Sequence, residues 1–195
     1  MIIEALLFVF IFALIKKYSF INAQDFPQKG VGFPLIYVAI QIICFFLIKF
    51  GKDSLVIRFI SQLSLLLFLP YFYFNRNYNG ILLMAAGSIL NMLVMYLNGG
   101  KMPIEPSYYR LIARDVDYEL TYRGLNIFHS LIDENTKLAV LGDIIPLIKP
   151  YPFPKLISIG DILIAGGFLY LSISVLRGDY IPLREEEEKG EEDEE

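Results

Sequence analysis

Apolar residues occur along this chain in long blocks that short polar stretches separate. Four blocks contain few or no charged side chains and are long enough to form bilayer-crossing helices: residues 33–48, 55–74, 80–97 and 157–176. The breaks between them are rich in Asn, Gln, Lys and Gly, which are typical of surface turns. The pattern therefore predicts four transmembrane helices.

A fifth apolar block, residues 2–15, is shorter. It reaches the length of a crossing helix if Lys16 and Lys17 extend their side chains to the membrane surface. We expect a retained helix rather than a cleaved signal, because the positive charge follows the apolar run instead of preceding it. The expected fold is an all-α integral membrane bundle of about five transmembrane helices. The alternative has four crossings, with the first block lying in the membrane interface.

Composition supports this class and separates a tail from the rest. The chain is 55% hydrophobic and 19% charged, unlike an ordinary soluble domain. Residues 185–195 hold nine acidic residues and one lysine, so we expect a disordered, solubilising acidic tail. A tail that binds a cation or a partner is the alternative. Residues 1–184 then form one membrane helical domain.

The positions of the basic residues predict an orientation in the cell membrane. Lys16 and Lys17 follow the first block, and two arginines follow the last, which places the N-terminus outside and the acidic tail in the cytoplasm. Lys49 and Lys52 favour the opposite orientation. The long segment 98–156, also placed outside, carries seven basic residues, but long loops translocate largely regardless of charge.

Segment 98–156 is the one part with soluble character, and we expect it at the membrane interface. Asn98 and two glycines should end the preceding helix. Residues 110–123 fit either a short helix or an extended run. Residues 124–132 have apolar positions at helical spacing and predict an amphipathic surface helix, which a turn at residues 133–136 should end.

Several classes of chemistry lack their usual motifs. The chain has one histidine and one cysteine, Cys44, and no phosphate-binding, dinucleotide-binding or serine-hydrolase motif. We therefore expect no metal site and no cofactor, with Cys44 buried as a small apolar residue. The basic residues are scattered, which argues against nucleic acid as a partner.

Two acidic residues attract attention. The stretch GDIIPLIKPYPFPKLISIGD, residues 142–161, carries a Gly-Asp pair at each end. Asp161 completes a Ser-x-x-Asp pattern that begins at Ser158 and caps helix starts, and Asp143 precedes Pro146 as turn residues do. If the proline-rich stretch folds back, the two carboxyl groups can meet and share one proton, as in an aspartic hydrolase. Both interpretations remain open at this point.

Short motifs resemble those of a known family of enzymes. VLGDII and LISIGDILIAGG resemble the paired aspartate motifs of the lipoprotein signal peptidases, and Asn91 resembles the asparagine of that family's preceding helix. The resemblance implies that Asp143 and Asp161 are catalytic. Ser158 stands where that family has asparagine, and no Asp-Arg pair follows Asn91.

A second resemblance covers more of the chain. NGGKMP, HSLIDENTKLAVLGDIIP and SIGD are similar to motifs of a bacterial multi-pass membrane protein family known only as a domain of unknown function. It implies no reaction. The candidate binding residues are Asn91, Asn98, Lys101, His129 and Ser158. Among them, Lys101 is a candidate to bind a lipid phosphate. His129 could pair with Asp133, four residues later, or act as an acid or base.

Three functional classes follow. The first is a non-catalytic accessory or scaffolding membrane protein, with membrane lipids and a membrane protein as partners. The second is a membrane-embedded aspartyl hydrolase that uses Asp143 and Asp161 on a lipid-linked or membrane-anchored substrate. The third is a small-solute transporter, in which Gln41, Gln62 and Asn91 line a path; as interhelical hydrogen-bond partners, the same residues support the first class.

Overall fold

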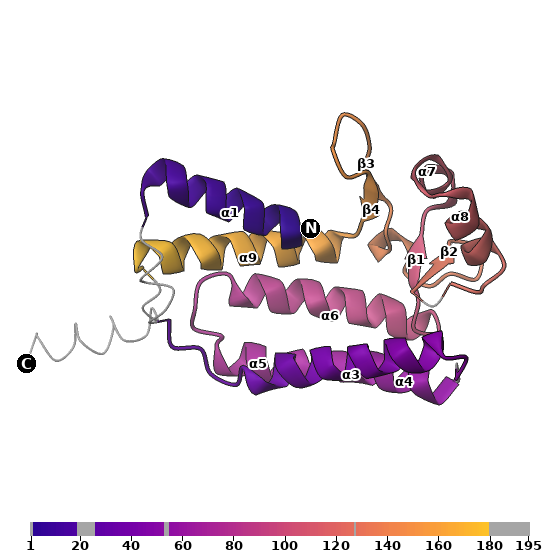
Figure 1. The fold of residues 1–195 in the computed structure, drawn as a ribbon, viewed down its shortest axis with the longest axis horizontal. Helices are drawn as coiled ribbons and strands as arrows, with labels where there is room; N and C mark the ends of the chain where they lie inside the picture. Colours follow the sequence, from indigo (N-terminus) through magenta and orange to yellow (C-terminus); the bar gives the residue numbers. More distant parts are fainter. Residues whose placement is uncertain (1, 19–25, 53–54, 127, 180–195) are drawn as a thin grey trace, which may run out of the picture.

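The computed structural model describes residues 2–18, 26–52, 55–126 and 128–179, and most of them are helical (Figure 1). The predicted acidic tail lies outside the described residues. The helices are α1 (Ile2–Lys16), α3 (Gly32–Lys49), α4 (Leu55–Leu63), η1 (Ser64–Leu67), α5 (Phe68–Phe74), α6 (Ile81–Leu97), α7 (Pro106–Ile112), α8 (Asp115–Tyr122), η2 (Ala139–Leu141) and α9 (Ile159–Arg177). The strands are β1 (Met102–Ile104), β2 (His129–Leu131), β3 (Ile145–Leu147) and β4 (Lys155–Ile157).

The long helices form a bundle, and the polar segment 98–156 gathers at one end of it. Figure 1 shows α9 between α1 and α6, with α3, α4 and α5 beyond α6. Glu4 contacts Lys155 just before α9, and Arg177 at its end donates to the Tyr18 hydroxyl at 3.1 Å, so α1 runs parallel to α9.

The contact between α6 and α9 is the most extensive in the bundle, and glycines make it close. A Cβ atom on Gly87 would lie 2.4 Å from the carbonyl oxygen of Gly160, and one on Gly167 would lie 2.5 Å from that of Gly80. Small residues of this kind allow helix backbones to approach in membranes. Because Gly87 faces Gly160 and Gly80 faces Gly167, the two helices are antiparallel, and segment 98–156 starts and ends at the same end.

The hairpin of α3 with α4, η1 and α5 is held by an amide between its helices. The side-chain amide of Gln41 donates to the carbonyl oxygen of Ser61 and to the hydroxyl of Ser64, both at 2.9 Å, and accepts from the Ser61 hydroxyl at 2.9 Å. This confirms Gln41 as an interhelical hydrogen-bond partner. Cys44, on the same helix, is buried as expected.

The helix predicted over residues 55–74 is interrupted. It is divided into α4, the 3-10 turn η1 and α5. Pro70 in α5 has no N–H to donate to the residue four positions earlier, which lies in η1. A tighter turn at that point satisfies the backbone differently, so the chain continues in one direction with a local change of pitch.

The outer faces of the helices are strongly apolar. Two helices, Gly32–Lys49 and Ile159–Arg177, are long and apolar enough to cross a membrane by length and composition. Large apolar side chains project outward from α1, α3, α4 and α6, among them Ile15, Leu35, Val56 and Leu82, each more than 60% exposed. Exposed apolar surface of this extent indicates contact with something other than water.

Segment 98–156 differs from the expected all-α architecture. β1 pairs in parallel with β2, and β3 pairs antiparallel with β4, so two small sheets accompany the helices. The surface helix predicted over residues 124–132 is wrong. Gly124 adopts a positive φ of 71°, and the Asn126 side chain accepts from the backbone N–H groups of Phe128 and His129, which sets up a strand instead of a helix. Residues 110–123 contribute to two short helices, α7 and α8.

Candidate functional site: a polar cluster at the start of the last helix

Helix α9 begins with a reciprocal cap. The Asp161 backbone N–H donates to the Ser158 hydroxyl at 3.0 Å, and the Ser158 backbone N–H donates to Asp161 Oδ2 at 3.2 Å. The carboxyl group of Asp161 also lies at the positive end of the helix dipole. The cap that the Ser-x-x-Asp pattern predicts is therefore confirmed.

Asn91 on α6 joins this cap from across the helix pair. Its amide nitrogen donates to Asp161 Oδ1 at 3.0 Å, and its amide oxygen accepts from the Ser158 hydroxyl at 2.9 Å. Ser158 has no exposed surface. A Cβ atom on Gly160 would lie 2.1 Å from Asn91 Oδ1, so this glycine leaves the room that the amide needs. Asn91, Ser158 and Asp161 form a closed hydrogen-bond ring.

Asp143 is placed by its backbone. Its N–H donates to the Pro103 carbonyl oxygen at 2.8 Å, and its own carbonyl oxygen accepts from the Glu105 N–H at 3.1 Å, so Asp143 bridges to β1 at Ile104. A Cβ atom on Gly142 would lie 2.6 Å from the Pro103 carbonyl oxygen, which explains the glycine beside this acid. β1 therefore lies between β2, which carries His129, and Asp143.

The side chain of Asp143 is an unusual acid. It is 10% exposed, and its Oδ2 lies 3.5 Å from Nε2 of His129. Its Oδ1 is buried without a hydrogen-bond partner among the residues that the structure describes. Burial raises the pKa of Asp143; the interaction with His129 opposes this, and the charge of Asp161 raises the pKa further. Asp143 is thus a buried acid, one of whose oxygens has no hydrogen-bond donor among the described residues.

The structure gathers some of the predicted site residues and separates others. Asn91, Ser158 and Asp161 form the ring, and His129 lies against Asp143 instead of Asp133. The predicted pairing of His129 with Asp133 is wrong, because those residues share no helix. Asp133 accepts from Asn135 and Thr136 in the predicted turn.

Asn98 and Lys101 have other structural contacts. The Asn98 amide donates to the carbonyl oxygens of Val94 and Lys137, each at 2.8 Å, and accepts from the Lys137 N–H at 2.9 Å. The ammonium group of Lys101 donates to the Gly124 carbonyl oxygen at 2.8 Å. Both side chains therefore fasten the polar segment to itself and to the end of α6.

The arrangement limits the chemistry of the cluster. Each oxygen of the Asp161 carboxyl group accepts one hydrogen bond, Oδ1 from Asn91 and Oδ2 from the Ser158 backbone. In Asp143, Oδ2 faces His129, and the buried Oδ1 has no partner among the described residues. Within the described part of the chain, no group of three or more His, Cys, Asp or Glu residues is arranged to hold a metal ion.

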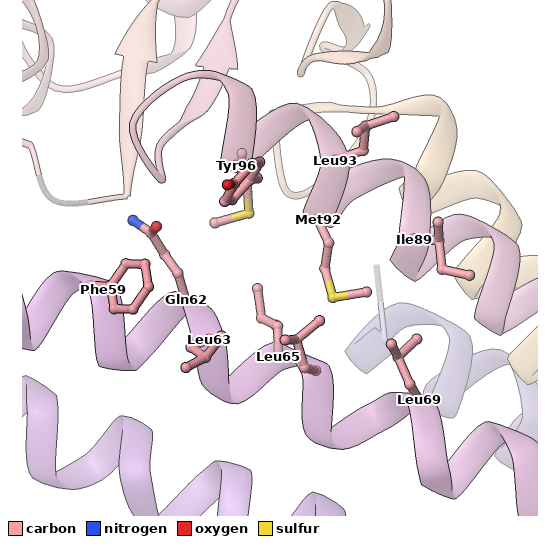
Figure 2. Close-up of a pocket in the computed structure, with 11 residues that line it drawn as sticks. Phe59, Gln62, Leu63, Leu65, Leu69, Ile89, Met92, Leu93 and Tyr96 are labelled. Atoms are coloured by element: carbon pink, nitrogen blue, oxygen red, sulfur yellow. The ribbon is translucent and has the colours of Figure 1, made fainter.

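A groove that the sequence did not reveal lies on the other side of α6. It has a volume of about 610 Å³ and runs between α6 and the helices α4 and α5. Figure 2 shows Met92 of α6 and Leu65 of η1 directed into the space between the helices. The groove is lined from α6 by one helical face, formed by Ile89, Met92, Leu93 and Tyr96. A face that contacts lipid has the same composition, so the sequence alone does not distinguish the two.

The fold and the cluster define a mostly helical protein with a hydrogen-bonded polar segment at one end and two helices able, by length and composition, to cross a membrane. The family of unknown function DUF5317 matches residues 25–173, and the chain belongs to this family. An uncharacterized protein of Thermotoga maritima is 35% identical over 109 residues, which are 55% of this chain and 60% of that relative. The chain thus spans about three fifths of the relative's length. No solved structure matches the chain.

Proposed function

We propose that this chain is a polytopic protein of the cell membrane with a non-catalytic accessory or scaffolding role. It crosses the bilayer with α1, α3, the interrupted helix of α4, η1 and α5, then α6 and α9. Segment 98–156 lies at the outer face, and the C-terminal end lies in the cytoplasm. The parallel course of α1 and α9 and the antiparallel course of α6 and α9 support this topology.

The dimensions and surfaces of the helices support the membrane placement. α3 and α9 contain 18 and 19 residues, so they are about 27–28 Å long, close to the thickness of a bilayer core. Their neighbours present large apolar side chains outward. In a bilayer these side chains contact lipid tails, whereas in water so much exposed apolar surface would be unfavourable.

The closed ring of Asn91, Ser158 and Asp161 is the observation that carries the non-catalytic role. An aspartic hydrolase needs two carboxyl groups with oxygens free to bind and activate water. In this chain, Asp161 uses both oxygens to bind the start of α9 and the side of α6. The ring ties the start of α9 to α6, directly after the end of segment 98–156.

The surface of the polar segment supports a membrane-protein partner. Leu111 and Val116 on α7 and α8 are 74% and 68% exposed, and Tyr122 is 70% exposed. Exposed apolar side chains on an otherwise polar segment are typical of contact surfaces between proteins. The proposed role is that the bundle holds this surface at the membrane face.

Complementation of a deletion strain tests the proposal. Val116→Glu should abolish rescue of the deletion phenotype, while Asp143→Asn and Asp161→Asn retain it in proportion to the amount of folded protein in the membrane. Glu134→Lys, another exposed charge change in the segment, is the control and should rescue fully. Loss of rescue by Asp143→Asn at normal membrane abundance would contradict the non-catalytic role.

A second candidate function is a membrane-embedded aspartyl hydrolase acting on a lipid-linked or membrane-anchored substrate. The observation that favours it is the buried Asp143, whose Oδ1 has no partner among the described residues and whose pKa is raised by burial. In this role, Asp143 and Asp161 handle the proton of an attacking water, and His129 positions Asp143. Rescue by Val116→Glu combined with failure of both Asp143→Asn and Asp161→Asn is the result that this function predicts.

A further inference from the structure

The apolar groove beside α6 adjoins a second cavity whose lining is more polar. The groove is lined mainly by leucine, methionine and aromatic side chains of α4, η1, α5 and α6. The second cavity, of about 210 Å³, includes Tyr37, Gln41 and Ser61 in its lining. Gln62, Leu65 and Met95 line both cavities, so the two are neighbours, with these side chains at their boundary.

The junction lies at the end of the bundle that carries segment 98–156. The Gln62 amide donates to the Gly99 carbonyl oxygen at 3.5 Å, a long and weak contact. A Cβ atom on Gly100 would lie 1.1 Å from Gln62 Nε2, so the Gln62 amide occupies the space beside this glycine. The polar cavity is also lined by Phe128 of the polar segment. The polar cavity therefore extends from the middle of α3, at Tyr37 and Gln41, to segment 98–156.

We propose that the groove and the polar cavity together bind one glycerolipid with an uncharged, hydroxyl-bearing head, of the monoacylglycerol class. The acyl chain lies in the groove, and the glycerol hydroxyls bind among Gln62, Ser61 and Tyr37. This proposal rests on the membrane placement given under Proposed function. The groove volume of about 610 Å³ is within the range of cavities that hold small molecules.

The lining selects this ligand over a charged lipid. None of the described residues that line the two cavities carries a charge. Phosphate and carboxylate heads are bound by arginine or lysine side chains, whereas amides and hydroxyls bind hydroxyls.

The lining also disfavours a helix of a second protein or a second copy. Helices pack closely in membranes through small residues. The small residues Gly80 and Gly87 at and within α6 face α9, and the groove side of α6 presents Met92 and Leu93 instead. A flexible acyl chain fits between such side chains without close backbone approach.

Photolabelling tests the proposal. The full chain is reconstituted in phosphatidylcholine nanodiscs with a diazirine-bearing monoacylglycerol, irradiated and digested, and adducts are located by mass spectrometry. We expect adducts concentrated on residues 59–69 and 89–96, about tenfold above a phosphatidylglycerol probe with the same chain, which corresponds to about 1.4 kcal/mol. Equal labelling by both probes, or even labelling of all outward helix faces, would overturn the proposal.

Variants make the result specific. Met92→Trp and Leu66→Trp, which place an indole in the groove, should each reduce labelling there about tenfold. Ile11→Trp, on the outward face of α1, should not. Unchanged labelling in both groove variants, with circular dichroism showing normal helix content, rejects the site, as do cross-links joining the groove peptides of two copies.

Carbonate extraction of native membranes separates this proposal from the one it rests on. Extraction of the wild-type chain into the wash would overturn the membrane placement and the lipid site together. Retention in the membrane with no groove labelling would overturn the lipid site alone.

Discussion

Two adjacent glycines in α9 offer a sharp test of the helix packing. Gly167 lies against α6, where a Cβ atom would be 2.5 Å from the Gly80 carbonyl oxygen and 2.8 Å from the Met84 backbone nitrogen. Gly166 is the matched control, because a Cβ atom there has no neighbour within 4 Å in the described structure. Both positions are in the middle of the same helix, so their backbone propensities are equal.

The expected magnitudes follow from this geometry. Replacing glycine by alanine inside a helix is worth about 0.5–1 kcal/mol of stabilisation when the space is free. At Gly167 the backbone atoms of α6 cannot move without separating the helices, and overpacking of this kind costs about 1–3 kcal/mol. Gly167→Ala should therefore destabilise the protein by about 1–2 kcal/mol, while Gly166→Ala should be neutral or stabilising.

Thermal unfolding of the detergent-solubilised protein, followed by circular dichroism, measures the difference. For a chain of this size, we expect Gly167→Ala to lower Tm by roughly 2–8 °C relative to wild type. Gly166→Ala should leave Tm unchanged or raise it. Equal Tm values for the two variants, or a larger loss at Gly166, would refute the close approach of α6 and α9.

Further predictions concern the cluster and the bundle. The raised pKa of Asp143 means that this carboxyl group keeps its proton to higher pH in the folded state than in the unfolded chain, so the free energy of unfolding should fall as the pH rises through that pKa. Melting curves recorded over a range of pH should show this fall in Tm for the wild type and not for Asp143→Asn. Ser158→Ala should cost about 1 kcal/mol through loss of the cap, measured as a lower Tm, and an unchanged Tm would contradict the cap. Asn98→Ala should speed amide hydrogen exchange at Lys137, because the Lys137 N–H donates to the Asn98 side chain; unaltered exchange at Lys137 would refute that hydrogen bond. Cys44 should react with a maleimide only as the protein unfolds, whereas rapid labelling of the folded protein would show that α3 is packed differently.

The local parts of this structure were accessible from the sequence. Long apolar blocks between polar turns predict helices, because their length is that of a helix and exceeds that of an ordinary strand. The Ser158–Asp161 cap was predictable because both partners lie within one turn. The interhelical hydrogen bonds of Gln41 were also predictable, because a polar side chain in an apolar helix needs a partner.

The non-local parts were not accessible. β1 and β2 have three residues each, which is too short to show the alternation of apolar and polar residues that marks a strand. They also pair across more than twenty positions of the sequence. The partnership of His129 with Asp143 depends on that pairing, so the helical spacing of residues 124–132 led to a wrong prediction. Asn91 stood out as polar, but its bonds to Ser158 and Asp161 depend on the register of α6 against α9.

Cysteine labelling across the membrane tests the central proposal most directly. In a Cys44→Ala background, Leu125→Cys places an exposed thiol in the polar segment, and Asn77→Cys places one at the opposite end of the bundle. A membrane-impermeant maleimide applied to intact spheroplasts should label Leu125→Cys at once and Asn77→Cys only after lysis. Immediate labelling of both positions, or of Asn77→Cys alone, would contradict a bundle that crosses the membrane with segment 98–156 outside.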